Sequence, residues 1–103
     1  MRVERDGWFI DIDILDVSER PNWELRCAIR RTKDDEEDER GHRFFVSPEI
    51  CERMGIGEMT EDSREHLMTR AAKKVILREF TEIFAEPEGG LDSLRPLTAD
   101  DLR

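Results

Sequence analysis

Residues 7–15, which read GWFIDIDIL, alternate strictly between two sets of side chains. One set is apolar and consists of Trp8, Ile10, Ile12 and Ile14. The other set includes two acids and consists of Phe9, Asp11, Asp13 and Leu15. Successive side chains of a β-strand point to opposite faces, so this period of two predicts a strand with one buried face and one solvent-facing side.

Two later stretches extend this strand into a sheet. Residues 23–30 alternate in the same way, after a polar turn that contains Pro21 and Asn22. Residues 42–47, which read HRFFVS, form a third candidate strand. We therefore predict a three-stranded antiparallel β-meander with residues 23–31 at its centre.

The register of this meander follows from the requirement that all apolar faces share one side of the sheet. With the first turn centred near residues 18 and 19, Ile12 is predicted to lie opposite Leu25. The same rule for the next pair of strands places Ile29 opposite Phe44. On the other face, the same registers align three side chains in one row, namely Phe9, Ala28 and Phe45. Two phenylalanines on a nominally solvent-facing side need cover. This row is therefore the first candidate partner-binding surface.

The segment between the second and third strands is strongly acidic. Residues 33–40, which read KDDEEDER, contain six acids and two bases. Like charges in one block repel one another and favour full solvation. The composition therefore predicts a solvent-exposed loop that ends at Gly41.

Two helices follow the predicted strands. Ser47 and Pro48 are typical of the cap and first position of a short helix, which Gly55 ends. Thr60 caps a longer helix, and Pro87 ends it. The apolar side chains of the longer helix recur at helical spacing, and they are Leu67, Met68, Ala71, Ala72, Val75, Ile76, Phe80, Ile83 and Phe84.

These elements predict a single two-layer α+β domain over residues 1–87. It contains the three-stranded antiparallel meander, followed by the short helix and the long helix packed on one sheet face. Residues 88–103 are predicted to form a C-terminal tail that is loosely docked or flexible.

The composition argues against several classes of partner. A formal net charge of −9 opposes contact with nucleic acids and with anionic membrane surfaces. No apolar run approaches the roughly 18 residues that a membrane span needs, and the first residues lack the apolar segment of a signal peptide. Two cysteines do not make a disulfide framework. We therefore expect a cytoplasmic protein.

Two carboxylates on one strand raise the question of a metal site. Asp11 and Asp13 share a face, and such pairs can hold Mg²⁺ where further ligands converge. No glycine-rich phosphate loop accompanies them, so an ion pair between Asp11 and Arg26 is the preferred interpretation. A small metal-dependent enzyme, or a metal- or phosphate-binding protein that uses Asp11 and Asp13, is the alternative hypothesis.

The histidines and cysteines have no spacing that is typical of a metal centre. We expect His42 and His66 to face solvent or to form local hydrogen bonds. Cys27 and Cys51 fall on apolar faces and are expected to pack as small hydrophobic side chains. The sequence therefore predicts no catalytic residue, no metal ligand and no cofactor.

The long helix carries a cationic ridge on an otherwise acidic chain. Arg70, Lys74 and Arg78 recur every four residues and so share one helix face. This ridge is either a solvated helix face or a docking surface for an acidic partner. It is the second candidate partner-binding surface.

These features favour a non-catalytic protein-interaction or regulatory module over an enzyme. The two expected edge strands, residues 7–15 and 42–47, contain no proline and few interior charges to block further pairing. We predict a homodimer that uses the sheet, either edge to edge or face to face through Phe9 and Phe45. The rival prediction is a monomer in which the C-terminal tail covers that face.

Overall fold

The structure is a computed structural model that describes residues 2–19, 23–85 and 94–103. Its strands are β1 (Arg2–Arg5), β2 (Trp8–Glu19), β3 (Trp23–Lys33), β4 (Glu36–Phe45) and β5 (Leu94–Pro96). Its helices are α1 (Pro48–Met54), α2 (Glu61–Arg78), α3 (Phe80–Ala85) and α4 (Ala99–Leu102), with a 3₁₀ turn at Ile56–Glu58.

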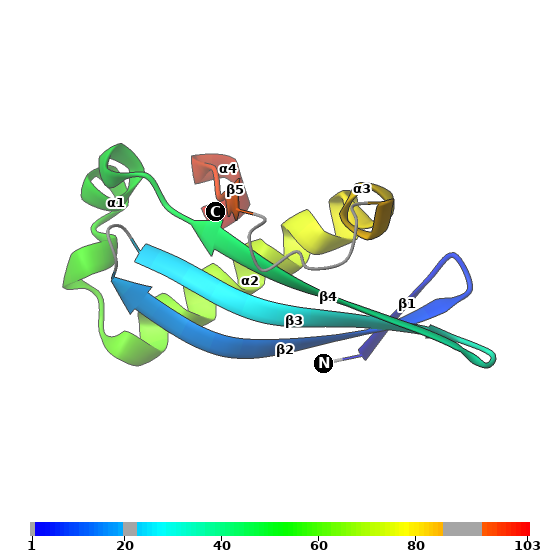
Figure 1. Cartoon of the computed structure of the whole chain (residues 1–103). Coiled ribbons are helices and arrows are strands. Elements are labelled where there is room, and N and C mark those ends of the chain that lie inside the picture. Colours follow the sequence, from blue (N-terminus) through cyan, green and yellow to red (C-terminus); the bar gives the residue numbers. More distant parts are fainter. Residues whose placement is uncertain (1, 20–22, 86–93) are drawn as a thin grey trace.

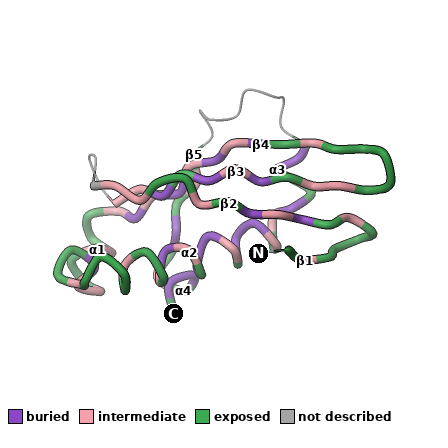
Figure 2. Tube along the Cα trace, turned by 90° about the horizontal axis from the view of Figure 1, so that it is seen from below, coloured by how far each residue is buried: buried purple, intermediate pink, exposed green. Residues whose placement is uncertain are grey.

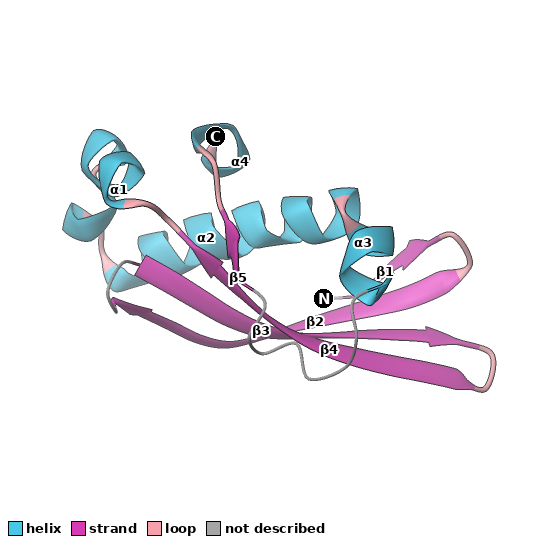
Figure 3. Cartoon of the chain, turned by 45° about the horizontal axis from the view of Figure 1, so that its top comes forward, coloured by secondary structure: helices cyan, strands magenta, loops and turns pink. Residues whose placement is uncertain are grey.

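The described strands form one sheet in the order β1-β2-β3-β4-β5 (Figure 1). β5 runs parallel to β4, and the other neighbours are antiparallel. The helices gather on one side of this sheet, which gives two layers (Figures 2 and 3). The fold is therefore α+β, but the prediction of a three-stranded, purely antiparallel sheet is wrong.

The additional strand β1 arises from a tight hairpin that the sequence prediction overlooked. Asp6 and Gly7 both have positive φ angles, 53° and 83°, which two-residue hairpin turns require. Val3 consequently lies opposite Ile10. An Asp-Gly dipeptide before an alternating run is a strong hairpin signal, and it was present in the sequence.

The predicted loop over residues 33–40 is also wrong. A two-residue turn with Asp34 at a φ of 52° joins β3 directly to β4. The acids that follow lie opposite arginines of β3, and the Nε atom of Arg30 is 3.4 Å from Glu37 and 3.6 Å from Glu39. Opposite charges across neighbouring strands stabilise the pairing, and this offsets the repulsion within the block.

Both predicted strand registers are wrong by four residues, and the register of β2 with β3 is wrong by five beyond Ile14. Ile12 lies opposite Ile29, and Leu25 lies opposite Phe44. β2 continues to Glu19 and β4 begins at Glu36, so both strands are longer than predicted. The residues that pair across the strands are shifted accordingly. Because an offset of four is even, each side chain paired in this way keeps its face. The predicted core face is confirmed by the burial of Ile10, Ile12, Leu25, Cys27, Ile29, Phe44 and Val46.

The same offset separates the predicted row of Phe9, Ala28 and Phe45. Phe9 lies opposite Thr32, and Phe45 lies opposite Glu24. These two partners are eight positions apart on β3, which corresponds to roughly 26 Å. Ala28 lies midway between them, so the three residues do not form one surface.

Both predicted helix starts are confirmed. The hydroxyls of Ser47 and Thr60 each accept a hydrogen bond from a backbone N–H of the first helical turn, at 3.4 and 3.2 Å. Gly55 ends α1 with a φ of 64°, in the left-handed region that glycine adopts readily. The predicted single long helix is interrupted at Glu79, which lies between α2 and α3.

Beyond this interruption, α3 lies over Arg31 of β3. The Glu79 carboxylate accepts a hydrogen bond from Arg95 at 3.0 Å. Phe84 then lies over Arg31 of β3, with the guanidinium carbon 4.4 Å from the ring centroid. Trp8 of β2 lies 4.3 Å from the same guanidinium. The Phe80 ring lies 5.7 Å from it as well, so Arg31 is near three aromatic rings, a favourable arrangement for a cation.

Residues 94–103 pack against β4 and α2. The backbone N–H of Leu97 donates to the carbonyl of Phe45 at 2.8 Å, and the side chains of Leu97 and Leu102 are buried in the core. The domain boundary after residue 87 stays a prediction. The predicted helix end at Pro87 and the predicted turn at residues 21–22 lie outside the described residues.

No helix in the described ranges is both long and apolar enough to cross a membrane.

Candidate partner-binding site

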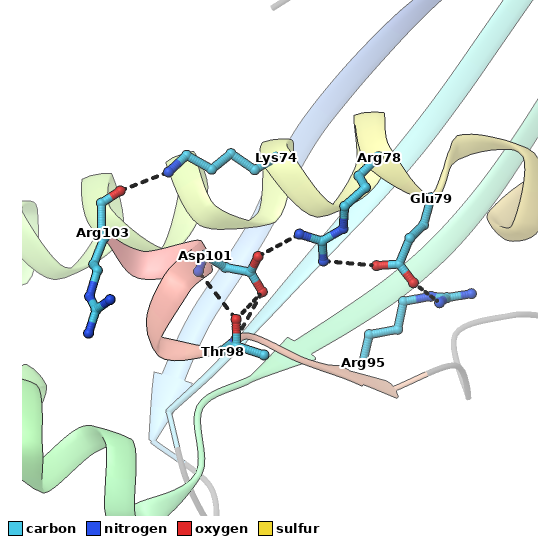
Figure 4. Close-up of polar contacts among 7 residues, drawn as sticks. All are labelled: Lys74, Arg78, Glu79, Arg95, Thr98, Asp101 and Arg103. Atoms are coloured by element: carbon cyan, nitrogen blue, oxygen red, sulfur yellow. Dashed lines mark hydrogen bonds and ion pairs between the residues drawn. The ribbon is translucent and has the colours of Figure 1, made fainter.

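The cationic ridge of α2 contacts the end of its own chain (Figure 4). The Arg78 guanidinium donates to Asp101 at 2.9 Å, and Lys74 Nζ donates to the carbonyl of Arg103 at 2.7 Å. Arg70 donates to the carbonyl of Leu102 at 3.2 Å. Cations stabilise the carbonyl end of a helix, so the ridge holds α4 against α2.

Asp101 is the centre of this contact and is 3% exposed. The hydroxyl and backbone N–H of Thr98 donate to its carboxylate at 2.9 and 3.0 Å. Burial acts to raise the pKa of Asp101, but the hydrogen bonds from Thr98 and Arg78 outweigh it and hold the pKa below its ordinary value. The charged carboxylate is therefore the form that fits this site.

The sheet face opposite the helices carries cross-strand ion pairs. Arg26 lies 3.8 Å from Asp16 of β2, and Arg43 lies 3.5 Å from Glu24 of β3. Phe9 is 43% exposed on this face. The Arg26–Asp16 pair is about half exposed, and exposed pairs contribute little net free energy. The Arg43–Glu24 pair is less accessible, because the Glu24 side chain is only 14% exposed.

The two aspartates of the alternative metal hypothesis lie on this same face. Asp11 pairs with Arg2 at 3.2 Å rather than with Arg26, which corrects the predicted ion pair. The hydrogen bond from Arg2 lowers the pKa of Asp11 below its ordinary value. Asp13 is exposed. Across the described ranges, the structure shows no group of three or more acidic, histidine or cysteine side chains that could hold a metal ion.

The core face contains a cysteine and a histidine on neighbouring strands. Cys27 lies opposite His42, and both side chains are fully buried. Burial raises the pKa of the Cys27 thiol to about 12, so the reactive thiolate is scarce at neutral pH. Of the two alternatives expected for His42, exposure to solvent is wrong. The spacing of this histidine from Phe44 and Val46, both on the core face, was the available signal.

A long part of β2 has an open edge. β1 pairs with four of the 12 residues of β2, Trp8–Asp11, and so leaves eight, Ile12–Glu19. No other described strand pairs with this edge. The pairing of β2 with β3 shifts between Ile14 and Asp16. This β-bulge leaves Leu15 56% exposed.

A cleft of about 510 Å³ lies beside this edge, between β2 and the first turns of α2. Its described lining consists of Ile14, Leu15, Asp16, Val17, Ser18, Trp23, Glu61, Arg64 and Glu65. The edge and the cleft are contiguous because β2 supplies both. We call them together the β2 groove.

Arg64 fixes the wall of the β2 groove. Its guanidinium donates to the carbonyls of Ile56, Gly57 and Met59 at 2.9, 3.2 and 2.8 Å. The same guanidinium lies 3.8 Å from the ring centroid of Trp23. One side chain thus joins α2, the preceding 3₁₀ turn and the start of β3, and its charge is directed into the protein.

The remaining charges of the β2 groove are negative. Glu61 and Glu65 are one helical turn apart and exposed, and Asp16 of β2 also belongs to the lining. The site could not be predicted from the sequence, since it depends on the true register and on contacts of Arg64 with the carbonyls of residues 56–59. The aromatic Trp23 at the start of a strand was the one available signal.

Comparison of the chain with models of protein families, with curated proteins and with solved structures gave no match.

Proposed function

We propose that this chain is a non-catalytic protein-interaction module that binds an extended segment of a partner along the open edge of β2. The observation that carries this proposal is the eight-residue stretch of β2 that β1 leaves unpaired. An exposed edge offers a row of backbone donors and acceptors, and an added strand gains affinity from pairing with them. The adjacent cleft would distinguish between alternate side chains of that strand.

Two features support this proposal over a catalytic role. The buried Cys27 has the raised pKa of an unreactive thiol. Asp11, one member of the alternative metal pair, is neutralised by Arg2. A thermal-shift screen with divalent metals discriminates the two hypotheses, because a ligand of the folded state raises the melting temperature. A clear shift that is lost in Asp13→Ala would favour the metal hypothesis.

The homodimer stays a prediction. An edge-to-edge contact that pairs the whole open stretch Ile12–Glu19 with its copy would place Asp13 opposite Ser18 and diagonal to Asp16 of the other copy. Carboxylates on the diagonal are farther apart than a directly opposed pair, so the charges of β2 do not decide against this form. The face-to-face form has lost its basis, because Phe9 and Phe45 lie at opposite ends of the sheet.

The proposed function can be tested with a display library of ten-residue peptides of unbiased sequence. Selected peptides should slow amide hydrogen exchange over residues 12–19 when added to the folded chain. β4 supplies an internal control, since its residues 36–42 also lack a described partner on their outer side. Selection of no peptide, or protection of β4 alone, would contradict the proposal.

A further inference from the structure

The charges around the β2 groove restrict what can lie in it. Side chains of an added strand alternate between the two faces of the sheet. One set would lie beside Asp13 and Asp16, which are on the face opposite the helices. The other set would lie over the cleft, near Glu61 and Glu65. Both sets therefore meet carboxylates.

The one base in the described lining does not balance these acids. The Arg64 guanidinium already donates to three backbone carbonyls and lies against the ring of Trp23. Arg26 lies 3.8 Å from Asp16, with both side chains about half exposed. No ion pair with a described residue is seen for Glu61 or Glu65. The groove thus presents a net negative charge to an occupant.

We propose that the β2 groove binds an extended segment rich in lysine or arginine from a partner protein. This inference rests on the proposed function and adds the chemistry of the occupant. Lysine and arginine have long apolar stems and charged ends. Over the cleft, the stems would pack on Ile14, Val17 and Trp23 while the charged ends reach Glu61 and Glu65.

Charge complementarity favours this occupant over the other classes. A second copy of this chain carries the same acids on its own β2 and a formal net charge of −9. A nucleic acid would bring phosphates against the carboxylates of the groove. A cationic strand is the occupant that relieves the repulsion among these acids.

Three eight-residue peptides with blocked ends test the proposal by fluorescence anisotropy at low salt. The cationic probe is KTKVKTKV. Its neutral counterpart, QTQVQTQV, keeps the alternation and removes the charge. The third probe, KTKPKTKV, keeps the charge, but its proline cannot donate a backbone hydrogen bond to a sheet. The cationic probe should bind at least about fivefold more tightly than either of the other two, since charge and strand pairing both contribute.

Matched variants locate the binding. Glu61→Gln/Glu65→Gln should weaken the cationic probe about fivefold, because two exposed ion pairs are lost. Glu36→Gln/Glu82→Gln removes the same charge at exposed positions outside the lining of the cleft and should leave the affinity within about twofold. Circular dichroism of each variant checks that the fold is retained.

The outcomes separate this inference from the proposed function. Equal binding of the cationic and neutral probes, with protection over residues 12–19, would overturn the inference and leave strand addition standing. Equal binding of the cationic and proline probes would mean diffuse attraction and would overturn both. If no probe binds, the cationic occupant is wrong, and the peptide library then decides whether β2 binds other segments.

Discussion

The two open edges of the sheet differ in what lies beside them. On β2, the open stretch Ile12–Glu19 borders the cleft and the start of α2. On β4, β5 pairs only with Arg43–Phe45. The remainder of β4 continues into a hairpin that extends past the helices (Figure 3). Within the described residues, both edges offer unpaired backbone, but only β2 is proposed as a binding site.

The difference shows how the charge of a strand edge and its neighbouring side chains determine whether it can accept an added strand. The start of β4 carries four acids in succession, Glu36, Glu37, Asp38 and Glu39. Charged side chains at an edge discourage unwanted pairing. The open part of β2 has its acids spaced along the strand and next to an apolar wall that includes Trp23. An incoming strand can therefore pair with β2 and also bury side chains beside it.

The largest expected change in the free energy of unfolding comes from a substitution in the core of β2, and a substitution at the β4 edge should change it far less. Ile12 anchors β2 in the core and is 4% exposed, so Ile12→Ala should lower the free energy of unfolding by about 2–5 kcal/mol. Arg30 holds the acids of β4 through exposed pairs, so Arg30→Ala should cost under about 1 kcal/mol. Urea titration measures both. Equal losses would mean that the β4 hairpin has a tertiary role beyond these ion pairs.

A smaller loss should follow from loosening the wall of the β2 groove. Arg64→Lys keeps the positive charge but cannot reproduce the planar fork that reaches three carbonyls. We expect a loss of about 1–3 kcal/mol in the free energy of unfolding, since two partly buried carbonyl acceptors lose a charged donor. The variant should also bind the cationic probe more weakly. Unchanged affinity would show that the cleft does not contribute to recognition.

The segment 94–103, which contains the strand paired with the end of β4, should lose stability at low pH. The folded pKa of Asp101 lies below its ordinary value, and that of an unfolded aspartate is about 3.9. The carboxylate therefore stabilises the fold fully above about pH 4, and this contribution is lost as the pH falls through the folded pKa. Asp101→Asn should cost about 1 kcal/mol at pH 7 and should flatten the pH dependence of stability below about pH 4.

Hydrogen exchange locates that effect on the sheet. Weakening the contact between α4 and α2 should expose the amides of Leu97 and its neighbours before those in the centre of β3. Loss of protection in β3 at the same pH as in residues 94–103 would show that the C-terminal segment and the sheet unfold as one unit.

The sequence predicted the local and periodic features of this fold. Alternation assigned the faces of β2 and β3, and two hydroxyl residues, Ser47 and Thr60, marked the helix starts. These signals act within one turn or one strand. The position of β5 could not be predicted, because a three-residue strand is selected by its long-range pairing with β4 rather than by its own pattern.

The candidate site was harder to predict from the sequence than the fold was. The predicted row of Phe9 and Phe45 required a register, and an error of four residues removed it while leaving every face correct. The acidic block was wrongly predicted to be a loop. Its acids lie opposite Arg30 and Arg31 only when the hairpin folds, although both arginines come just before the block in the sequence. Predicting the β2 groove would require both the strand register and the contacts that form only in the folded chain. No local sequence pattern around Arg64 indicates its three contacts.

The substitution with the smallest expected effect on stability best tests which of the two edges binds the cationic probe. Asp13 is exposed, and no described residue forms an ion pair with it. Asp13→Asn should therefore change the free energy of unfolding by less than about 0.5 kcal/mol. It should nevertheless weaken the cationic probe about two- to threefold, because one carboxylate beside the added strand is lost. Glu37→Gln removes a charge from the β4 edge and should leave that affinity unchanged. If Glu37→Gln had the larger effect, the cationic segment would be binding the β4 edge, and the roles assigned to the two edges would be reversed.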